Sequence, residues 1–129
     1  MQIYILCNVA KIEMLKKAFF YCDLESIDGA YCEFGVFEGT SFLAALKLNT
    51  QMAGKTDRNF YGFDSFDDGF KYFDDRDRHP FFKEGDFKSS LDRVRGRLKR
   101  YGNQRLFPGY FEETIQGKTP REVLGKDER

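Results

Sequence analysis

One stretch decides the fold of this chain, and it reads Tyr31-Cys32-Glu33-Phe34-Gly35-Val36-Phe37-Glu38-Gly39-Thr40-Ser41. Its first half predicts a β-strand over 30–36, which is apolar except for one carboxylate and therefore typical of a central parallel strand. A turn marked by two glycines follows, and an amphipathic helix is expected from Ser41 to Leu48. A strand, a glycine turn and a helix in this order form the crevice in which α/β domains bind nucleotides.

A second strand is expected at 59–64, and it ends in the carboxylate of Asp64. At the tip of the neighbouring strand, a carboxylate can accept hydrogen bonds from both hydroxyls of a ribose. The alternative is a solvated loop aspartate with no ligand. Together with the glycine turn, Asp64 favours a cofactor crevice.

The remaining pattern continues the α/β order. Apolar residues at helical spacing predict a helix over 11–24 and a second one that begins at Ser89 or Ser90 and ends at Gly102. A short third strand is expected at 104–108. The intervening segment 65–86 is dense in Asp and Phe, and loops of this length tend to be lids or binding elements.

These elements predict a Rossmann-like parallel sheet with flanking helices in a single domain. The expected parts are a helical lead-in over 1–28, a cofactor-binding half over 29–115 and a polar tail over 116–129, with fraying at 126–129.

Composition argues against several classes of protein. The chain has 129 residues and zero formal net charge, with 21 basic and 21 acidic residues, so no global field favours nucleic acid or an acidic membrane. Its three cysteines form neither a CxxC pair nor a zinc pattern, which favours reduced thiols in a cytoplasmic protein. We expect no signal peptide and no membrane span, because there is no basic leader and no long apolar run.

The turn itself allows two readings. Gly35 lets the chain leave the strand sharply, and Gly39 lets the helix begin close to a ligand. Thr40 and Ser41 would place hydroxyls and N–H groups at the helix N-terminus, where an anionic carboxylate is stabilised. Burying Glu33 alone is costly, so it needs a partner such as a ligand ammonium. In an ordinary strand-to-helix turn, backbone donors would satisfy it instead, and both readings stay open.

Four blocks of sequence in the same order resemble the macrocin O-methyltransferase family. The blocks are 33–41, 61–66 (Tyr-Gly-Phe-Asp-Ser-Phe), 85–87 and 109–115, and the resemblance runs from about Gly29 to Ile115. Members of that family are class I S-adenosylmethionine-dependent methyltransferases that act on hydroxyls, including those of macrolide sugars. The resemblance therefore implies O-methyl transfer to a hydroxyl of a sugar or another small molecule.

The resemblance also implies a set of cofactor-binding residues. The methionine part of S-adenosylmethionine would be held by the strand end and turn: Glu33, Gly35, Val36, Phe37, Gly39, Thr40 and Ser41. Asp64 would bind the ribose with Ser65 and Phe66 beside it, and Gly109 and Tyr110 would border the adenine. For Tyr110 the alternative is a packing aromatic after a short strand.

In the family, later aspartates are implied to bind Mg²⁺ near the acceptor hydroxyl, and the sequence ends at Arg129 before any such segment. We therefore expect a chain truncated after the third strand, with no catalytic residue or metal ligand identified. Its first strand would leave an apolar sheet edge through which copies could associate.

Other features have simpler interpretations. The Asp-rich loop fails the EF-hand spacing and is read as solvated. His79 is a possible general base, but in a polar loop before a proline it is read as a turn residue. The basic residues between Arg93 and Arg100 are read as the solvent face of a helix. Two rival functions remain: a non-catalytic interaction module, and an NAD-dependent oxidoreductase, against which the missing G-x-G-x-x-G turn counts.

Overall fold

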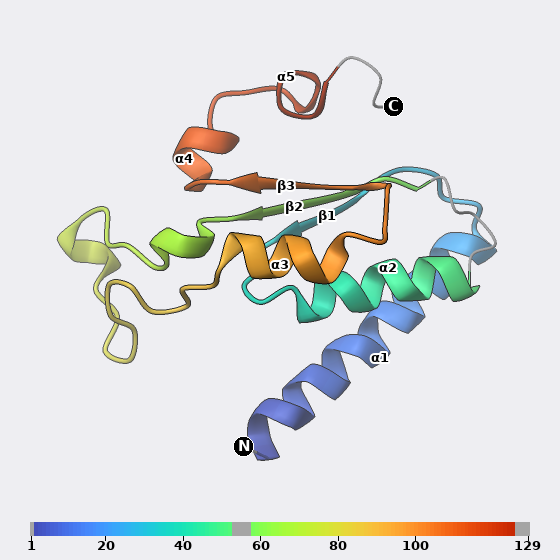
Figure 1. Cartoon of the computed structure of the whole chain (residues 1–129), viewed down its shortest axis with the longest axis horizontal. Coiled ribbons are helices and arrows are strands. Elements are labelled where there is room, and N and C mark those ends of the chain that lie inside the picture. Colours follow the sequence, from blue (N-terminus) through green and yellow to red (C-terminus); the bar gives the residue numbers. More distant parts are fainter. Residues whose placement is uncertain (1, 53–57, 126–129) are drawn as a thin grey trace.

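The computed structural model describes residues 2–52 and 58–125, and these form a three-stranded sheet with helices on both faces (Figure 1). The elements in chain order are α1 (Gln2–Leu24), β1 (Tyr31–Phe34), α2 (Thr40–Met52), β2 (Phe60–Asp64), the 3₁₀ turns η1 (Phe66–Asp68) and η2 (Asp75–Asp77), α3 (Leu91–Leu98), β3 (Gln104–Pro108), α4 (Phe111–Thr114) and α5 (Pro120–Leu124).

The sheet has the order β1-β2-β3, and both strand pairs are parallel. In the register, Glu33 lies opposite Gly62, and Asp64 lies opposite Pro108. All three expected strands are present, and the expected parallel sheet with flanking helices is confirmed. Because the strands are parallel, their carboxyl ends meet at one edge of the sheet, which is where ligands bind in this class of fold.

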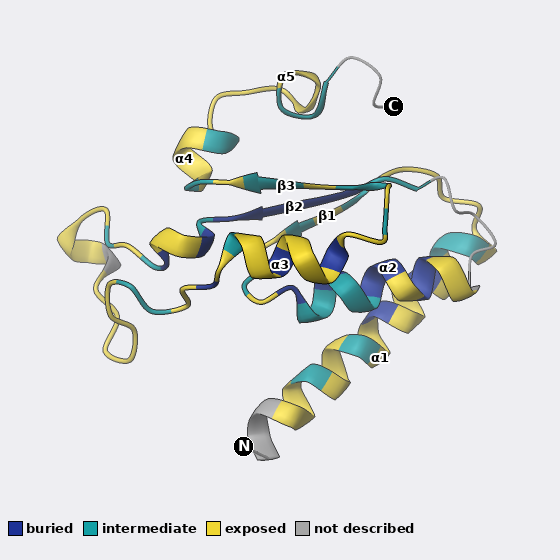
Figure 2. Ribbon diagram, in the orientation of Figure 1, coloured by how far each residue is buried: buried dark blue, intermediate teal, exposed yellow. Residues whose placement is uncertain are grey.

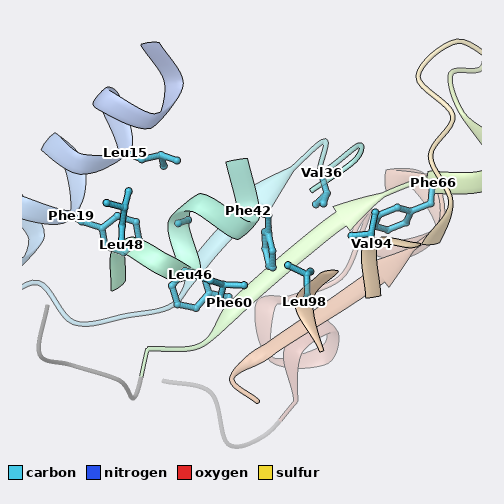
Figure 3. Packing of buried hydrophobic residues seen from close by; sticks show 11 residues of the cluster. Leu15, Phe19, Val36, Phe42, Leu46, Leu48, Phe60, Phe66, Val94 and Leu98 are labelled. Carbon is cyan, nitrogen blue, oxygen red and sulfur yellow. The ribbon is translucent and has the colours of Figure 1, made fainter. Parts of the chain in front are cut away.

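One face of the sheet is covered by α1, α2 and α3 (Figure 1). The core lies between these helices and β2, with contributions from the glycine turn and η1, and Figure 3 shows its side chains. Phe42 of α2 and Phe60 of β2 are fully buried and pack edge to face at 6.2 Å. The other members are Leu15, Phe19, Val36, Ala45, Leu46, Leu48, Phe66, Val94 and Leu98. Burying aromatic side chains of this size is the main source of stability in such a small domain.

The opposite face carries α4 and α5, and an aromatic ladder crosses its three strands. Phe63 stacks between Phe34 at 5.0 Å and Phe107 at 4.7 Å. All of β2 is buried, whereas Phe34 of β1 is 56% exposed (Figure 2). The apolar run over 30–36 is typical of a central parallel strand, but among the described residues β1 pairs with β2 alone and alternate residues of it are exposed. Association through this edge stays a prediction.

Several boundaries differ from the expected ones. The first helix begins at Gln2 instead of Lys11, and α3 ends at Leu98, before Gly102. A short helix, α5, forms in the expected polar tail because Thr119 caps it through the N–H of Glu122. The fraying expected at 126–129 lies outside the described residues. None of the described helices is long and apolar enough to cross a membrane.

Candidate cofactor site

A cavity of about 640 Å³ lies at the carboxyl ends of the strands, and we call it the strand-end cavity. Its volume is within the range usual for small-molecule sites. The strand ends and the segments that directly follow them contribute Gly35, Asp64, Ser65, Gly109, Tyr110, Phe111 and Glu112. The loop between β2 and α3 contributes Gly69, Phe70, Lys71, Phe73, His79, Phe82 and Phe87. The wall combines aromatic rings with several polar side chains, as is usual for small-molecule pockets.

Asp64, the last residue of β2, is one of the polar residues that line this cavity. Its side chain is nearly buried, and its two oxygens accept backbone N–H groups, Oδ2 from Phe37 and Oδ1 from Phe66, both at 2.7 Å. A carboxylate has about four acceptor positions, so about two remain. Because two rigid backbone donors fix the carboxylate, the remaining lone pairs are held in position for a ligand hydroxyl pair.

Glu33 sits at the tip of β1 and does not line the cavity. The Tyr31 hydroxyl donates to Oε2 at 2.6 Å, and the Ser41 hydroxyl donates to Oε1 at 2.7 Å. Burial raises the pKa of the Glu33 carboxyl, and the two hydroxyl donors partly oppose that rise. The donors that satisfy Glu33 are thus side-chain hydroxyls, neither the ligand ammonium nor the backbone groups that the sequence suggested. Its contact with a cofactor stays a prediction.

The glycine turn adopts the unusual backbone that its sequence requires. Gly35 has φ +88° and lines the cavity with open space where a Cβ would stand. Phe37, at the position of the second glycine in the generic motif, also has a left-handed φ of +52°. This conformation costs a non-glycine residue about 1–2 kcal/mol, and the hydrogen bond to Asp64 helps to hold it.

The missing side chain of Gly39 matters more for the packing of α3 than for the approach of a ligand. A Cβ on Gly39 would lie 3.1 Å from Cγ1 of Val94, so the missing side chain lets α3 pack against the turn. Val36 is buried in the core, and Thr40 is the first residue of α2. Gly39, Val36 and Thr40 therefore support the turn and do not line the cavity.

The third strand brings Gly109 and Tyr110 to the same edge. The Gly109 N–H donates to the Asp64 carbonyl at 3.0 Å, which ties the end of β3 to the end of β2. The Tyr110 ring meets Phe73 edge to face at 5.6 Å, and the Lys71 ammonium lies 5.3 Å from the Tyr110 ring centre. Tyr110 therefore lines the cavity and packs against the loop at once, and its contact with an adenine stays a prediction.

The loop after β2 folds back on its own start. The Ser89 N–H donates to the Phe66 carbonyl at 3.1 Å, and the Phe70 N–H donates to the Asp86 carbonyl at 2.7 Å. This closure turns Phe82 and Phe87 into the cavity wall. Sequence reasoning expected a lid or binding element here but named none of these aromatics as site residues. Their only signal is the density of Phe in a polar loop.

Ser65 and Phe66, expected beside the ribose, have different roles. The Ser65 side chain lines the cavity and its hydroxyl donates to the Gly69 carbonyl at 2.9 Å. Phe66 offers its N–H to Asp64, while its ring is fully buried in the core. Of the predicted residues, Gly35, Asp64, Ser65, Gly109 and Tyr110 thus meet in one cavity.

Two other features of the loop are His79, which lines the cavity, and a group of paired acidic and basic side chains. His79 stacks on Phe82 at 4.3 Å, and its Nδ1 accepts the Phe81 N–H at 3.2 Å, which leaves Nε2 as the site of the proton in the neutral ring. Asp74 and Asp75 pair with Arg76 and Arg78. Within residues 2–52 and 58–125, no three metal-binding side chains lie close enough together to hold an ion.

A larger hollow of about 920 Å³ is formed by the loop alone, between Tyr72 and Glu84. It contains no strand-end residue, and most of its lining residues are exposed. We therefore take the strand-end cavity, with its fixed carboxylate, as the candidate site.

Comparison with known proteins identifies the family and the fold. The model of the macrocin-O-methyltransferase (TylF) family matches residues 3–124. The solved structure of the O-methyltransferase NovP is similar to this fold, with a TM-score of 0.66 and 20% sequence identity. The similarity covers 82% of this chain and 47% of NovP, so the chain spans about half the length of that protein. None of the curated proteins compared with the chain matches it. The Rossmann-like methyltransferase fold is confirmed, and the chain belongs to the macrocin-O-methyltransferase (TylF) family.

Proposed function

We propose that this chain binds S-adenosylmethionine in the strand-end cavity and contributes to methyl transfer onto a hydroxyl of a sugar or another small molecule. Membership of the macrocin-O-methyltransferase family supports the reaction class. The likeness to NovP, described as an O-methyltransferase, supports it as well. The proposal concerns the whole protein to which such a fold belongs, because the chain spans about half of NovP.

One observation carries the cofactor assignment: Asp64 lines the cavity with both oxygens already fixed by the N–H groups of Phe37 and Phe66. The two remaining acceptor positions suit the two neighbouring hydroxyls of a ribose. Positions fixed before binding cost little ordering entropy when the ligand arrives.

The rest of the cavity fits the other parts of the cofactor. Aromatic rings of Phe73, Tyr110 and Phe111 offer faces and edges for an adenine. Gly35 leaves open space beside the turn, where the methionine end would pass. In this arrangement Glu33 holds Ser41 and so fixes the start of α2.

The bound cofactor supplies a methyl group on a positively charged sulfur, which an oxygen nucleophile can displace. The residues of this chain bind the cofactor, orient it and keep water away from it with the aromatic wall. We assign no general base. The described residues hold no cluster that fits Mg²⁺, so no step is assigned to a metal.

The test is a calorimetric titration of the chain with S-adenosylhomocysteine. Asp64→Ala removes the carboxylate and should weaken binding at least about tenfold, because hydrogen bonds to a charged acceptor are worth about 1.5–3 kcal/mol each. The matched control is Asp68→Ala, which removes an exposed carboxylate from the same loop and should leave the affinity unchanged. Circular dichroism of each variant checks that the fold persists.

Absence of binding to the wild-type chain, or equal affinities for wild type and Asp64→Ala, would refute the assignment. A titration with NAD under the same conditions separates the two nucleotide classes. Tighter binding of NAD than of S-adenosylhomocysteine would favour the oxidoreductase reading instead.

A further inference from the structure

The helix α1 presents apolar residues on two opposite sides. Its inner side faces α2 and the core through Ile12, Leu15 and Phe19, and the last two are buried. Leu6, Ala10, Met14, Tyr21 and Leu24 form a second row, which we call the outer stripe. Four of the five lie two positions beyond a residue that is buried or half-buried, namely Asn8, Ile12, Phe19 or Cys22. Two positions correspond to about 200° around an α-helix. The outer stripe therefore lies on the side of α1 that faces away from α2.

The outer stripe is exposed along its length. Leu6, Met14, Tyr21 and Leu24 are each 60–66% exposed. Figure 1 shows the N-terminal part of α1 extending past the rest of the fold, and Figure 2 shows the described side chains of this part, from residue 5 onward, as mostly exposed. Contiguous apolar surface of this kind is rare on a monomer and marks an interaction site.

The spacing of the stripe indicates the kind of partner. From Ala10 onward, with Lys17 counted, its members follow one another at intervals of four, three, four and three residues, as in the seam of a coiled coil. Leu6 extends the stripe one residue out of step with this repeat. Such a seam accepts another helix with the same repeat. Near its middle, Lys17 lies on the stripe, and Glu13 lies beside it as the ion-pair partner of Lys16 at 2.6 Å. These three residues carry a net charge of only +1, well short of the cluster of basic residues that binds an acidic membrane.

We propose that α1 is a dimerisation helix, and that its outer stripe packs antiparallel against the outer stripe of a second copy of this chain. In this register Leu6 meets Leu24 of the second copy, and small Ala10 meets large Tyr21. Met14 meets the aliphatic stem of Lys17 at the centre, and long charged side chains readily cover apolar surface in this way. The pairing is the same for both copies, as a two-fold contact requires.

Charge complementarity favours this register over the parallel one. Antiparallel packing brings Glu13 of each copy, which pairs with Lys16 of its own helix at the exposed surface, beside Lys17 of the other copy. Parallel packing would place Lys17 against Lys17, Tyr21 against Tyr21 and Ala10 against Ala10, which combines repulsion with poor filling. A single helix pair is a small interface, so we expect a dissociation constant on the order of 10 µM. The proposal is independent of the proposed function.

Sedimentation equilibrium over a concentration range spanning that value tests the proposal on the intact chain. The wild type should change from monomer to dimer as concentration rises. Tyr21→Asp places a charge in the seam and should leave a monomer at every concentration. The matched control is Phe81→Asp, which changes a phenylalanine that is 81% exposed on the loop and should leave the dimer intact.

A mixing experiment tests the register itself. Glu13→Lys makes both central positions basic, and Lys17→Glu makes both acidic, so each variant alone should dimerise more weakly than the wild type. An equimolar mixture should regain the dimer, because each copy then offers the charge that the other lacks.

A wild-type chain that stays monomeric at all concentrations would overturn the proposal. Persistence of the dimer in Tyr21→Asp would do the same, since the contact would then lie elsewhere, such as the β1 edge. A mixture no more dimeric than its separate components would overturn the antiparallel register.

Discussion

Glu33 is the next-to-last residue of β1 and Asp64 is the last residue of β2, and the two carboxylates are held by different kinds of donor. Side-chain hydroxyls from Tyr31 and Ser41 hold Glu33, whereas backbone N–H groups hold Asp64. Asp64 lines the strand-end cavity, and Glu33 does not. In the sequence both acids belong to apolar runs, but Glu33 lies within the strand expected at 30–36, whereas Asp64 ends the strand expected at 59–64.

The difference shows that a carboxylate near the end of a strand can use its hydrogen-bond acceptors either to hold the framework or to bind a ligand. Glu33 links β1 to the first turn of α2 through Ser41, and so belongs to the framework. Asp64 fixes the glycine turn through Phe37 and still faces open space, and so is placed for a ligand. We therefore expect changes around Glu33 to lower stability and changes around Asp64 to lower cofactor affinity.

The largest effect is expected at Gly62, which lies opposite Glu33 and two residues before Asp64. A Cβ there would lie 2.8 Å from side-chain atoms of Leu106 and Val36, so Gly62→Val overpacks the contact between α2 and the sheet. The free energy of unfolding should fall by about 3 kcal/mol in urea titrations. Gly96→Val is the control, because nothing lies within 4 Å of a Cβ at Gly96. Equal stability of the two variants would contradict this account.

A smaller loss is expected from Tyr31→Phe, which keeps the ring but removes the donor to Glu33. A buried carboxylate that loses one of two hydrogen bonds should lower the free energy of unfolding by about 2 kcal/mol at neutral pH. Cofactor affinity should change little. Tyr101→Phe is the control. The hydroxyl of Tyr101 accepts a hydrogen bond from the exposed side chain of Arg100. A marked loss of S-adenosylhomocysteine binding in Tyr31→Phe would place Glu33 in the binding site after all.

Ser65→Ala should have the opposite profile. Its hydroxyl ties the start of the long loop to Gly69, next to the cavity. Removing this bond should cost about 1 kcal/mol or less in global stability, yet weaken S-adenosylhomocysteine binding several-fold because the cavity wall loosens. Ser41→Ala is the mirror variant and should lower stability more than affinity. If calorimetry and urea titration rank the two variants in the reverse order, the division between framework and site is wrong.

The smallest effect is a gradual change with pH. Burial raises the pKa of Glu33 above its ordinary value of 4.5, so the folded state binds this proton more tightly than the unfolded state. The contribution of Glu33 is therefore greatest below that ordinary value and is lost as pH rises through the raised pKa. Glu33→Gln cannot titrate, so the stability of the wild type relative to this variant should decline with rising pH. Urea midpoints measured across that range provide the check, and a rising difference would contradict it.

Much of the sheet could be predicted because its signals are local. Asp64 marks where β2 ends, and β3 spans the expected residues from Gln104 to Pro108. The first strand lies within the expected range 30–36 but is shorter, Tyr31–Phe34. One of the two expected caps of α3, Ser90, accepts the Arg93 N–H at 3.3 Å. Each of these features depends on residues a few positions apart.

The parts that escaped prediction depend on distant contacts. The first turns of α1 carry apolar residues on opposite sides, so no single helical face emerges from residues 2–10. The roles of Phe82 and Phe87 in the cavity depend on the loop closing through Phe70 and Asp86, which no sequence period encodes. The hydroxyl donors of Glu33 come from Tyr31 and Ser41 only because β1 and α2 are packed together.

The left-handed backbone of Phe37 has a consequence for recognising such turns elsewhere. What the turn needs at its middle is a positive φ and an N–H aimed at the next strand's acid, and here a bulky aromatic meets that need. A pattern that demands glycine at every second position would pass over this chain. A search based on backbone dihedral angles, whatever the residue types, would retrieve it and would find other chains with the same turn conformation.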